Sequence, residues 1–315
     1  MPGEKIGFIG LGAMGDGMTR NLLRAGYAVC GYDKNAEAMA RLAAAGGAAA
    51  TGPSVAAVDA ALLLVCVFSA DQAEDVLFGE DGAAAQLPQG ATVVMHTTMA
   101  PEHARAMAER LAATGQLFLD APVTGGKRGA DEGTLTVIAS GPDAAMAAAQ
   151  GAFDAMGSRV YRIGAQVGAA STVKMINQLL VGIHIVAAAE GIALAARAGA
   201  DPKLVYEVIT HGQGNSLAFE SRVPDIFARD YAPRGVVDIL TKDLGIVTRA
   251  AAALNFPLPL TATALQQFLA AAASGHGGED AGAVVKVYER LAGIDVAAAA
   301  ESVTEELAEY VLILP

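Results

Sequence analysis

A lysine and two amides interrupt the most apolar stretch of this chain. Lys174, Asn177 and Gln178 are spaced at i, i+3 and i+4, so on a helix all three side chains project from one side. Burial disfavours the charged form of an amine and can lower its pKa well below the usual value of about 10.4. Lys174 therefore has the chemistry of a general base near neutral pH. A salt bridge between domains is an equally good interpretation of a buried lysine.

A glycine-rich turn near the start of the chain has the spacing of a phosphate-binding site. The turn GLGAMG directly follows the apolar run IGFI. Glycine at Gly10 permits a tight turn, glycine at Gly12 permits a pyrophosphate to approach, and glycine at Gly15 permits close packing of helix on strand. Together with Ala13 and Met14, these residues would place the phosphates at a helix N-terminus. The spacing predicts a dinucleotide-binding turn.

Asp33 gives the glycine turn its expected context. It ends the second predicted strand, in the segment VCGYDKN. A carboxylate at this place accepts hydrogen bonds from the adenosine ribose hydroxyls and repels a 2′-phosphate. The chain is therefore predicted to bind NAD rather than NADP, although the adjacent Lys34 reduces the discrimination. A glycine-rich turn that binds no nucleotide is the alternative interpretation.

Hydroxyls and glycines follow two further predicted strands. Thr98, in TTMAP, comes after the fifth strand, and Thr124, Gly125 and Gly126, in DAPVTGG, come after the sixth. Ligands of open parallel sheets bind beyond the carboxyl ends of the strands, so Thr98 could face a nicotinamide, or it could simply cap the helix that starts at Pro101. The backbone N–H groups of the paired glycines and the Thr124 hydroxyl predict a concave site for a carboxylate.

The elements that must position these residues change in character along the chain. As far as residue 162, short apolar runs alternate with helical patterns, the βαβ signature of a parallel sheet covered on both faces. Strands are predicted near residues 5–9, 28–32, 47–50, 61–67, 91–96, 117–120, 134–139 and 159–162. Beyond residue 164 only helical patterns appear, near 202–210, 238–254, 260–273 and 280–292. The predicted fold is an α/β Rossmann-type, doubly wound domain (1–164) followed by an all-α domain (165–315).

A long helix is predicted to join these two domains. Its pattern runs from Thr172 to Ala198, with Ser171 or Thr172 as the N-cap and Gly199 at the end. It is apolar on nearly every face, which predicts a helix buried all round. It is also the only candidate for a membrane span, and the polar residues inside it argue against that interpretation.

Composition excludes several classes of function. The chain has 315 residues, 53% of them hydrophobic and 17% charged, which argues against disorder. A net charge of −12 argues against nucleic acid or an anionic membrane as partner. Cys30 and Cys66 lie in apolar strand patterns, typical of free thiols in a reducing compartment, and no export signal is evident. A cytoplasmic protein with a small carboxylate substrate and no metal is expected.

Four motifs, in order along the chain, resemble those of the β-hydroxyacid dehydrogenases. They are GLGAMG, TTMAP, DAPVTGG and KMINQ, and the resemblance runs from Lys5 to about Gly293. It implies that Thr98 lies at the nicotinamide, that the segment 124–126 binds substrate, and that Lys174 is the catalytic acid/base.

The same resemblance implies roles for residues of the second domain. Asn177 would orient the substrate, and Lys242, in TKDLGIV, would reach the cofactor. Within the family, the segment HGQGNS resembles the L-threonate dehydrogenase branch, where Asn215 and Ser216 would offer hydrogen bonds to a polyhydroxylated acid. A plain helix cap is an equal interpretation of these two residues. A homodimer or homotetramer is also implied.

Two positions depart from the family pattern. The family usually has serine where Thr124 stands and commonly an acidic residue where His96 stands. The threonine keeps the hydroxyl and adds a methyl group, which could narrow the pocket, whereas the histidine has no evident interpretation.

The predicted function is NAD-dependent oxidation of a small hydroxy acid. Lys174 would remove the hydroxyl proton as hydride passes to the nicotinamide. A short sugar acid such as L-threonate is the favoured substrate. The alternatives are a 3-hydroxyisobutyrate dehydrogenase, a tartronate semialdehyde reductase, or a catalytically silent NAD-binding protein in which Lys174 is structural.

Overall fold

The computed structural model describes residues 4–301 of the chain. The chain forms two compact units, Met1–Ile176 and Asn177–Pro315, which are described here in turn. We call them the nucleotide unit and the helical unit.

The nucleotide unit is built on a single nine-stranded sheet with the order β3-β2-β1-β4-β5-β6-β8-β7, in which β9 pairs with β8. The strands are β1 (Lys5–Ile9), β2 (Ala28–Tyr32), β3 (Ala48–Ala49), β4 (Leu62–Val65), β5 (Thr92–Met95), β6 (Leu117–Asp120), β7 (Val123–Thr124), β8 (Leu135–Ser140) and β9 (Gly157–Gly164). Every predicted strand is present. The short β7 was not predicted, because two residues carry no periodicity.

The sheet is not parallel throughout. Pairing is parallel from β3 to β6, but β8 runs antiparallel to both β6 and β7, and β9 runs parallel to β8. The sequence pattern of a covered sheet does not reveal this reversal, since strand direction depends on connections rather than on periodicity.

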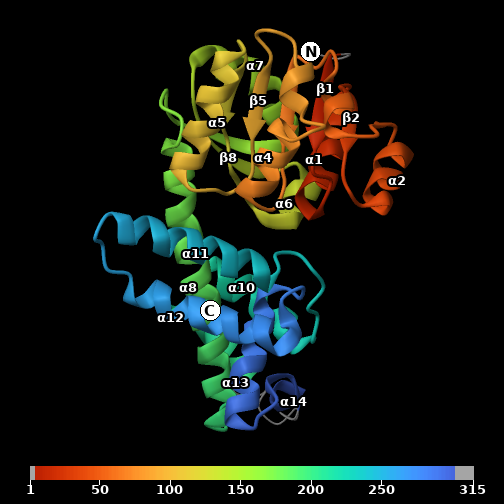
Figure 1. The fold of residues 1–315 in the computed structure, drawn as a ribbon. Helices are drawn as coiled ribbons and strands as arrows, with labels where there is room; N and C mark the ends of the chain where they lie inside the picture. The colour runs from red at the N-terminus through yellow and green to blue at the C-terminus, as the bar shows by residue number, and fades with distance from the viewer. Residues whose placement is uncertain (1–3, 302–315) are drawn as a thin grey trace, which may run out of the picture. The chain divides into compact units, whose positions relative to one another are not determined.

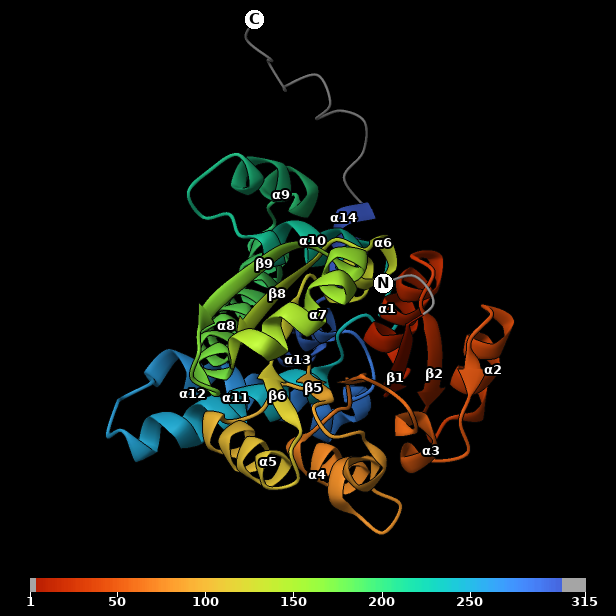
Figure 2. The same ribbon diagram turned by 90° about the horizontal axis from the view of Figure 1, so that it is seen from above.

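Helices cover both faces of this sheet (Figures 1 and 2). One face packs against α1 (Ala13–Arg24), α2 (Ala36–Ala44), α6 (Gly126–Glu132) and α7 (Asp143–Met156), with Phe8, Met18 and Phe153 fully buried. The other packs against α3 (Pro53–Ala57), α4 (Ala70–Phe78) and α5 (Pro101–Ala113), with Leu63 and Leu77 fully buried. The apolar run of β4 has no alternation because both its faces are covered.

The helical unit packs around one core. The helix α8 (Ala169–Arg197) belongs to this unit from Asn177 onward. The other helices are α9 (Pro202–Thr210), α10 (Leu217–Phe227), α11 (Val237–Ala253), α12 (Pro259–Ala271), α13 (Val285–Ala292) and α14 (Val296–Glu301). Ile192, Leu244 and Phe268 are fully buried at its centre. The helices α10 and α14 were not predicted. In the described residues beyond 164 there is no strand, only the isolated bridge between Val236 and Asp280.

The long helix α8 differs from its prediction in one respect. It is not buried all round, because Val173, Ile176, Leu180 and Leu194 are exposed along one side. The two compact units divide within it, after Ile176, and the domain boundary at residue 164 stays a prediction. This helix is long and apolar enough to cross a membrane, but the core helix of a soluble protein can have the same length and hydropathy.

Candidate functional site

The three glycines of the first turn are required for different reasons. Gly10 has a φ of 96°, and a Cβ there would overlap the carbonyl oxygen of Cys66. A Cβ at Gly15 would overlap the carbonyl oxygen of Gly10, so α1 packs on β1 only if residue 15 is glycine. By contrast, a Cβ at Gly12 would meet no heavy atom within 4 Å. The fold itself therefore requires Gly10 and Gly15, and the space beside Gly12 is open at the N-terminus of α1, where a pyrophosphate fits.

Asp33 lies against this turn. Its Oδ2 accepts a hydrogen bond from the backbone N–H of Leu11 at 2.7 Å, and its Oδ1 accepts one from Asn35 at 2.8 Å. The carboxylate is thus held beside the glycines, as a ribose-binding group should be. Lys34 is mostly exposed and lies 3.7 Å from Asp75 on α4, which gives this lysine an acidic neighbour within the protein.

The two threonines of TTMAP have different surroundings. Thr97 is buried, and its hydroxyl accepts a hydrogen bond from Val67 N at 3.1 Å, which ties the end of β5 to the segment after β4. Thr98 is half-buried. The N-cap residue of α5 is Ala100, whose side chain makes no capping hydrogen bond. For Thr98, capping of this helix and a role at the nicotinamide both stay predictions.

The segment after β6 has a backbone conformation that favours glycine. Thr124 ends β7 and is half-buried, while Gly125 and Gly126 have φ angles of 124° and 63°. These values suit glycine and curve the chain at the start of α6. Lys127, which follows these glycines, forms an ion pair with Asp131 on the same helix at 2.5 Å. Binding of a carboxylate at this turn stays a prediction.

Lys174 is 7% exposed on α8, and the first turn of that helix is held by a carboxylate from the sheet. Asp120, the last residue of β6, accepts hydrogen bonds from Ser171 Oγ (2.8 Å), Ser171 N (2.9 Å) and Gly168 N (3.0 Å). Burial raises the pKa of Asp120, although these hydrogen bonds act in the opposite direction. Because Ser171 lies one turn before Lys174, the end of β6 fixes the position from which the lysine projects.

A second hydrogen-bonded group lies in the helical unit. Asn177 donates from Nδ2 to Gln178 Oε1 at 2.9 Å, and Gln178 donates from Nε2 to Asp243 Oδ2 at 2.6 Å. The other oxygen of Asp243 forms an ion pair with Lys242 at 2.8 Å. Asn177 and Lys242, predicted separately, are thus joined through Gln178 and Asp243. The sequence reasoning missed the part played by Asp243, although an acid beside a lysine in an apolar helix was a visible signal.

Asn215 and Ser216 are engaged within the fold. The Ser216 hydroxyl caps α10 by accepting from Phe219 N at 3.0 Å. Asn215 donates from Nδ2 to the carbonyl of Thr210 and to the Glu220 carboxylate, and no hydrogen-bond partner for its buried Oδ1 is seen among the described residues. The cap interpretation is therefore confirmed for Ser216, and contact with substrate stays a prediction for both.

His96 lies at the carboxyl end of β5 as a buried, neutral imidazole. Its Nδ1 donates to the carbonyl oxygen of Ala121 at 2.6 Å, and the Phe153 ring packs edge-on at a centroid distance of 6.2 Å. Burial lowers the pKa of His96 from 6.5 to about 4, against the opposing effect of the Ala121 hydrogen bond. The carboxyl end of β5 therefore carries an uncharged group, which links β5 to the segment after β6.

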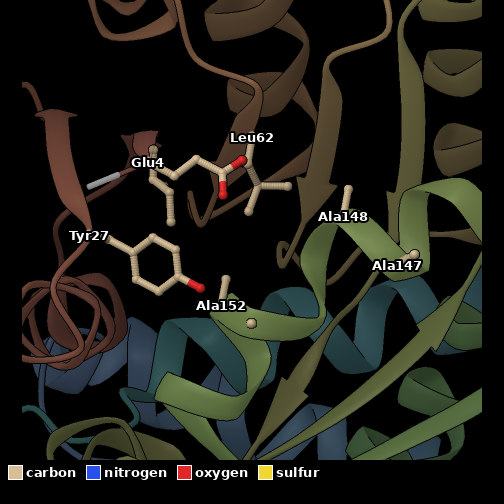
Figure 3. A pocket seen from close by; sticks show the side chains of 8 residues that line it. Glu4, Tyr27, Leu62, Ala147, Ala148 and Ala152 are labelled. Atoms are coloured by element: carbon tan, nitrogen blue, oxygen red, sulfur yellow. The ribbon is translucent and has the colours of Figure 1, made fainter. Parts of the chain in front are cut away.

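A cavity of about 260 Å³ lies at the other end of the sheet (Figure 3). Glu4, Tyr27 and Leu62 line it near the amino ends of β1, β2 and β4, and small residues of α7 form the opposite wall. Ligands of open α/β sheets bind at the carboxyl ends, so this cavity is not the predicted nucleotide site. Within residues 4–301, no three His, Cys, Asp or Glu side chains gather as a set of metal ligands.

Two protein families match this chain in succession. The NAD binding domain of 6-phosphogluconate dehydrogenase matches residues 5–164, and the NAD-binding domain of NADP-dependent 3-hydroxyisobutyrate dehydrogenase matches residues 168–288. L-threonate dehydrogenase of Cupriavidus necator is 48% identical over 95% of this chain and 99% of its own length. The chain belongs to the β-hydroxyacid dehydrogenase family.

Further relatives agree with this assignment. L-threonate dehydrogenase of Escherichia coli K12 is 44% identical over 91% of this chain and 95% of its own length. A crystal structure described as 3-hydroxyisobutyrate dehydrogenase from Salmonella typhimurium has a TM-score of 0.85 and 45% identity, covering 90% of this chain and 99% of the other. As a β-hydroxyacid dehydrogenase, the protein is an oxidoreductase acting on CH–OH groups with NAD as cofactor.

Proposed function

We propose that this dehydrogenase oxidises L-threonate, or a closely related short sugar acid, with NAD. The observation that carries the proposal is the 48% identity, over nearly the whole of both chains, to an L-threonate dehydrogenase. The polar segment 211–216 supports it, because a polyhydroxylated acid has more hydroxyls to bind than a methyl-bearing one.

The proposed roles of the residues follow from their chemistry. When bound, NAD supplies the hydride acceptor. Lys174 takes the proton from the substrate hydroxyl during oxidation and returns it during reduction. Asn177 orients that hydroxyl, and the backbone N–H groups at Gly125 and Gly126, with the Thr124 hydroxyl, hold the substrate carboxylate.

Discrimination between the nucleotides is assigned to Asp33. Its carboxylate, held at the glycine turn by Leu11 N, would receive the ribose hydroxyls and repel the additional phosphate of NADP. Lys34 reduces this repulsion, although Asp75, 3.7 Å away, compensates part of the lysine charge. We therefore expect kcat/KM to be higher with NAD than with NADP.

We also propose that the protein is a cytoplasmic homo-oligomer, a dimer or a tetramer. Support comes from large apolar side chains exposed on the helical unit, which include Leu194, Val208 and Leu217. Exposed apolar surface of this kind favours a protein partner. The reduced thiols Cys30 and Cys66 suit the cytoplasm.

The experiment that tests the substrate is a panel of hydroxy acids, assayed by the absorbance of reduced nicotinamide. L-threonate should give a kcat/KM at least about tenfold above that of 3-hydroxyisobutyrate, because a site that binds hydroxyls rejects an analogue lacking them. A preference for 3-hydroxyisobutyrate would instead support the second candidate, which the name of the Salmonella protein favours. Turnover of no acid, with NAD still bound, would identify a catalytically silent protein.

A further inference from the structure

Two polar residues without an assigned role lie between Asn177 and Lys242. Gln178 belongs to α8 and Asp243 to α11, and each is less than a tenth exposed. The two helices approach closely just beyond this pair, since a Cβ on Gly182 would lie 2.8 Å from a Leu244 methyl carbon. This close approach allows the 2.6 Å hydrogen bond between Gln178 and Asp243.

The carboxylate of Asp243 sets the direction of the whole chain of hydrogen bonds. A carboxylate paired with an ammonium group only accepts, so Gln178 must turn its Nε2 toward Asp243. The Gln178 oxygen then points the other way, toward Asn177. Asn177 can meet that oxygen only with its own Nδ2, at 2.9 Å. The orientation of the Asn177 amide is therefore determined by a carboxylate two residues away in the network.

We infer that Gln178 and Asp243 are positioning residues for the dehydrogenase reaction. Gln178 fixes which way the Asn177 amide faces, and Asp243 fixes Gln178 together with the Lys242 ammonium group. One buried carboxylate thus positions both the residue proposed to orient the substrate and the residue proposed to reach NAD. This inference rests on the proposed roles of Asn177 and Lys242.

A merely structural role for the pair would have different consequences. Buried polar networks commonly stabilise a fold, and cutting one would lower stability without a selective effect on substrate. The positioning role predicts instead that Gln178 acts through Asn177. A double-mutant cycle measures such dependence directly, because residues that act through each other have non-additive effects.

The test combines Gln178→Met, which keeps the volume and removes the hydrogen bonds, with Asn177→Ala. The substrate is whichever hydroxy acid the wild-type enzyme oxidises best. Gln178→Met should lower kcat/KM for that acid by about tenfold, mainly through KM, the loss expected for one net hydrogen bond. In the Asn177→Ala background the same substitution should change kcat/KM by less than about twofold. Equal losses in both backgrounds would overturn the positioning role of Gln178.

Nucleotide binding tests the proposed role of Asp243 and does not depend on turnover. Asp243→Asn keeps the shape of the side chain and removes its charge, so NAD should bind several-fold more weakly, as titrated by calorimetry. Asp280→Asn is the matched control, because Asp280 is also 1% exposed in the helical unit and pairs with Arg222. It should lower the melting temperature and leave NAD affinity unchanged. Equal NAD affinity in wild type and Asp243→Asn would refute the role of Asp243.

Failure of the proposed function is recognised separately. A wild-type enzyme that prefers another acid changes the substrate assignment and leaves the double-mutant cycle interpretable. A protein that oxidises no acid refutes the substrate-linked part of the inference, and the nucleotide titration then decides the part concerning Asp243.

Discussion

Lys174 combines burial with a helix position that the sheet determines. Asp120 holds Ser171, one turn earlier, by two hydrogen bonds of 2.8 and 2.9 Å. These hydrogen bonds fix the backbone that carries Lys174 relative to the end of β6, so the start of its side chain is held in place.

We predict that Lys174→Met lowers kcat by roughly 100-fold or more, because general acid/base catalysis contributes about that much. The methionine keeps the apolar volume, so NAD affinity should remain within about twofold. Steady-state kinetics and calorimetry measure the two quantities. Lys203→Met, on an exposed lysine of α9, is the control and should alter neither. Normal turnover in Lys174→Met would remove this lysine from the mechanism.

His96 makes the stability of the nucleotide unit depend on pH. Its pKa is about 4 in the folded protein against 6.5 for a free side chain, so the unfolded chain binds the proton more readily. Stability is therefore lost as the pH falls from about 6.5 toward 4. The loss from this group approaches about 3 kcal/mol at full protonation. The nearby Asp120 has the opposite sign, because burial raises its pKa and the folded state then holds the proton more readily.

The variant His96→Gln tests this assignment. We compare the free energy of unfolding of the variant with that of wild type at each pH. From pH 7 to pH 4 this difference should shift in favour of the variant by up to about 3 kcal/mol, because glutamine has no proton to gain. Chemical denaturation at several pH values measures the difference, and Asp120 is present in both proteins. A difference that stays flat with pH would show that the imidazole is not held neutral by burial.

At the scale of the element, the turn between β1 and α1 contains two glycines that the fold requires and one that it does not. Gly10 and Gly15 leave no room for a Cβ, whereas Gly12 has open space and a φ of −67° that alanine adopts readily. Of these three glycines, Gly12 alone has no structural requirement, which agrees with its predicted place beside the pyrophosphate.

Gly12→Ala and Gly15→Ala should therefore fail in different ways. Gly12→Ala should leave the melting temperature nearly unchanged and weaken NAD binding by about tenfold or more, because the methyl group occupies the phosphate site. Gly15→Ala should cost about 1–3 kcal/mol of stability through overpacking against the Gly10 carbonyl. Melting curves with and without NAD distinguish the two. The same loss of stability in both variants would contradict this division.

At the scale of the whole molecule, exposed apolar side chains on the helical unit support the proposed self-association. On α8, Leu180 and Leu194 are 47% and 66% exposed, whereas other apolar residues of the same helix are buried. An apolar side of a long helix can be covered by a second copy of the same chain, in which the same surface meets itself.

Leu194→Glu should therefore reduce the assembly toward a monomer of 31.8 kDa, because a charge in an apolar interface is strongly unfavourable. Light scattering after size exclusion measures the mass. Val58→Glu, on the nucleotide unit, is the control and should leave the mass unchanged. A wild-type protein that already elutes at 31.8 kDa would show that the exposed leucines serve another purpose.

Local physics was sufficient to predict much of this protein from its sequence. The periodicity of short apolar runs predicted the strands, and the apolar content of β4 predicted its central place. Glycine spacing predicted the turn at residues 10–15, because the need for a positive φ at Gly10 is a property of one residue. Four short motifs in order were specific enough to predict the family.

The tertiary structure decided what depends on residues distant in sequence. The N-terminal turn of α8 was expected to be capped by Ser171 or Thr172, but Asp120, about fifty positions earlier, accepts its backbone hydrogen bonds. The hydrogen bond between Gln178 and Asp243 likewise joins residues that are sixty-five positions apart. The exposed side of α8 likewise depends on which helices pack against it. Hydrophobic periodicity reports only near neighbours along the chain, so contacts of this range become visible only when the fold brings the residues together.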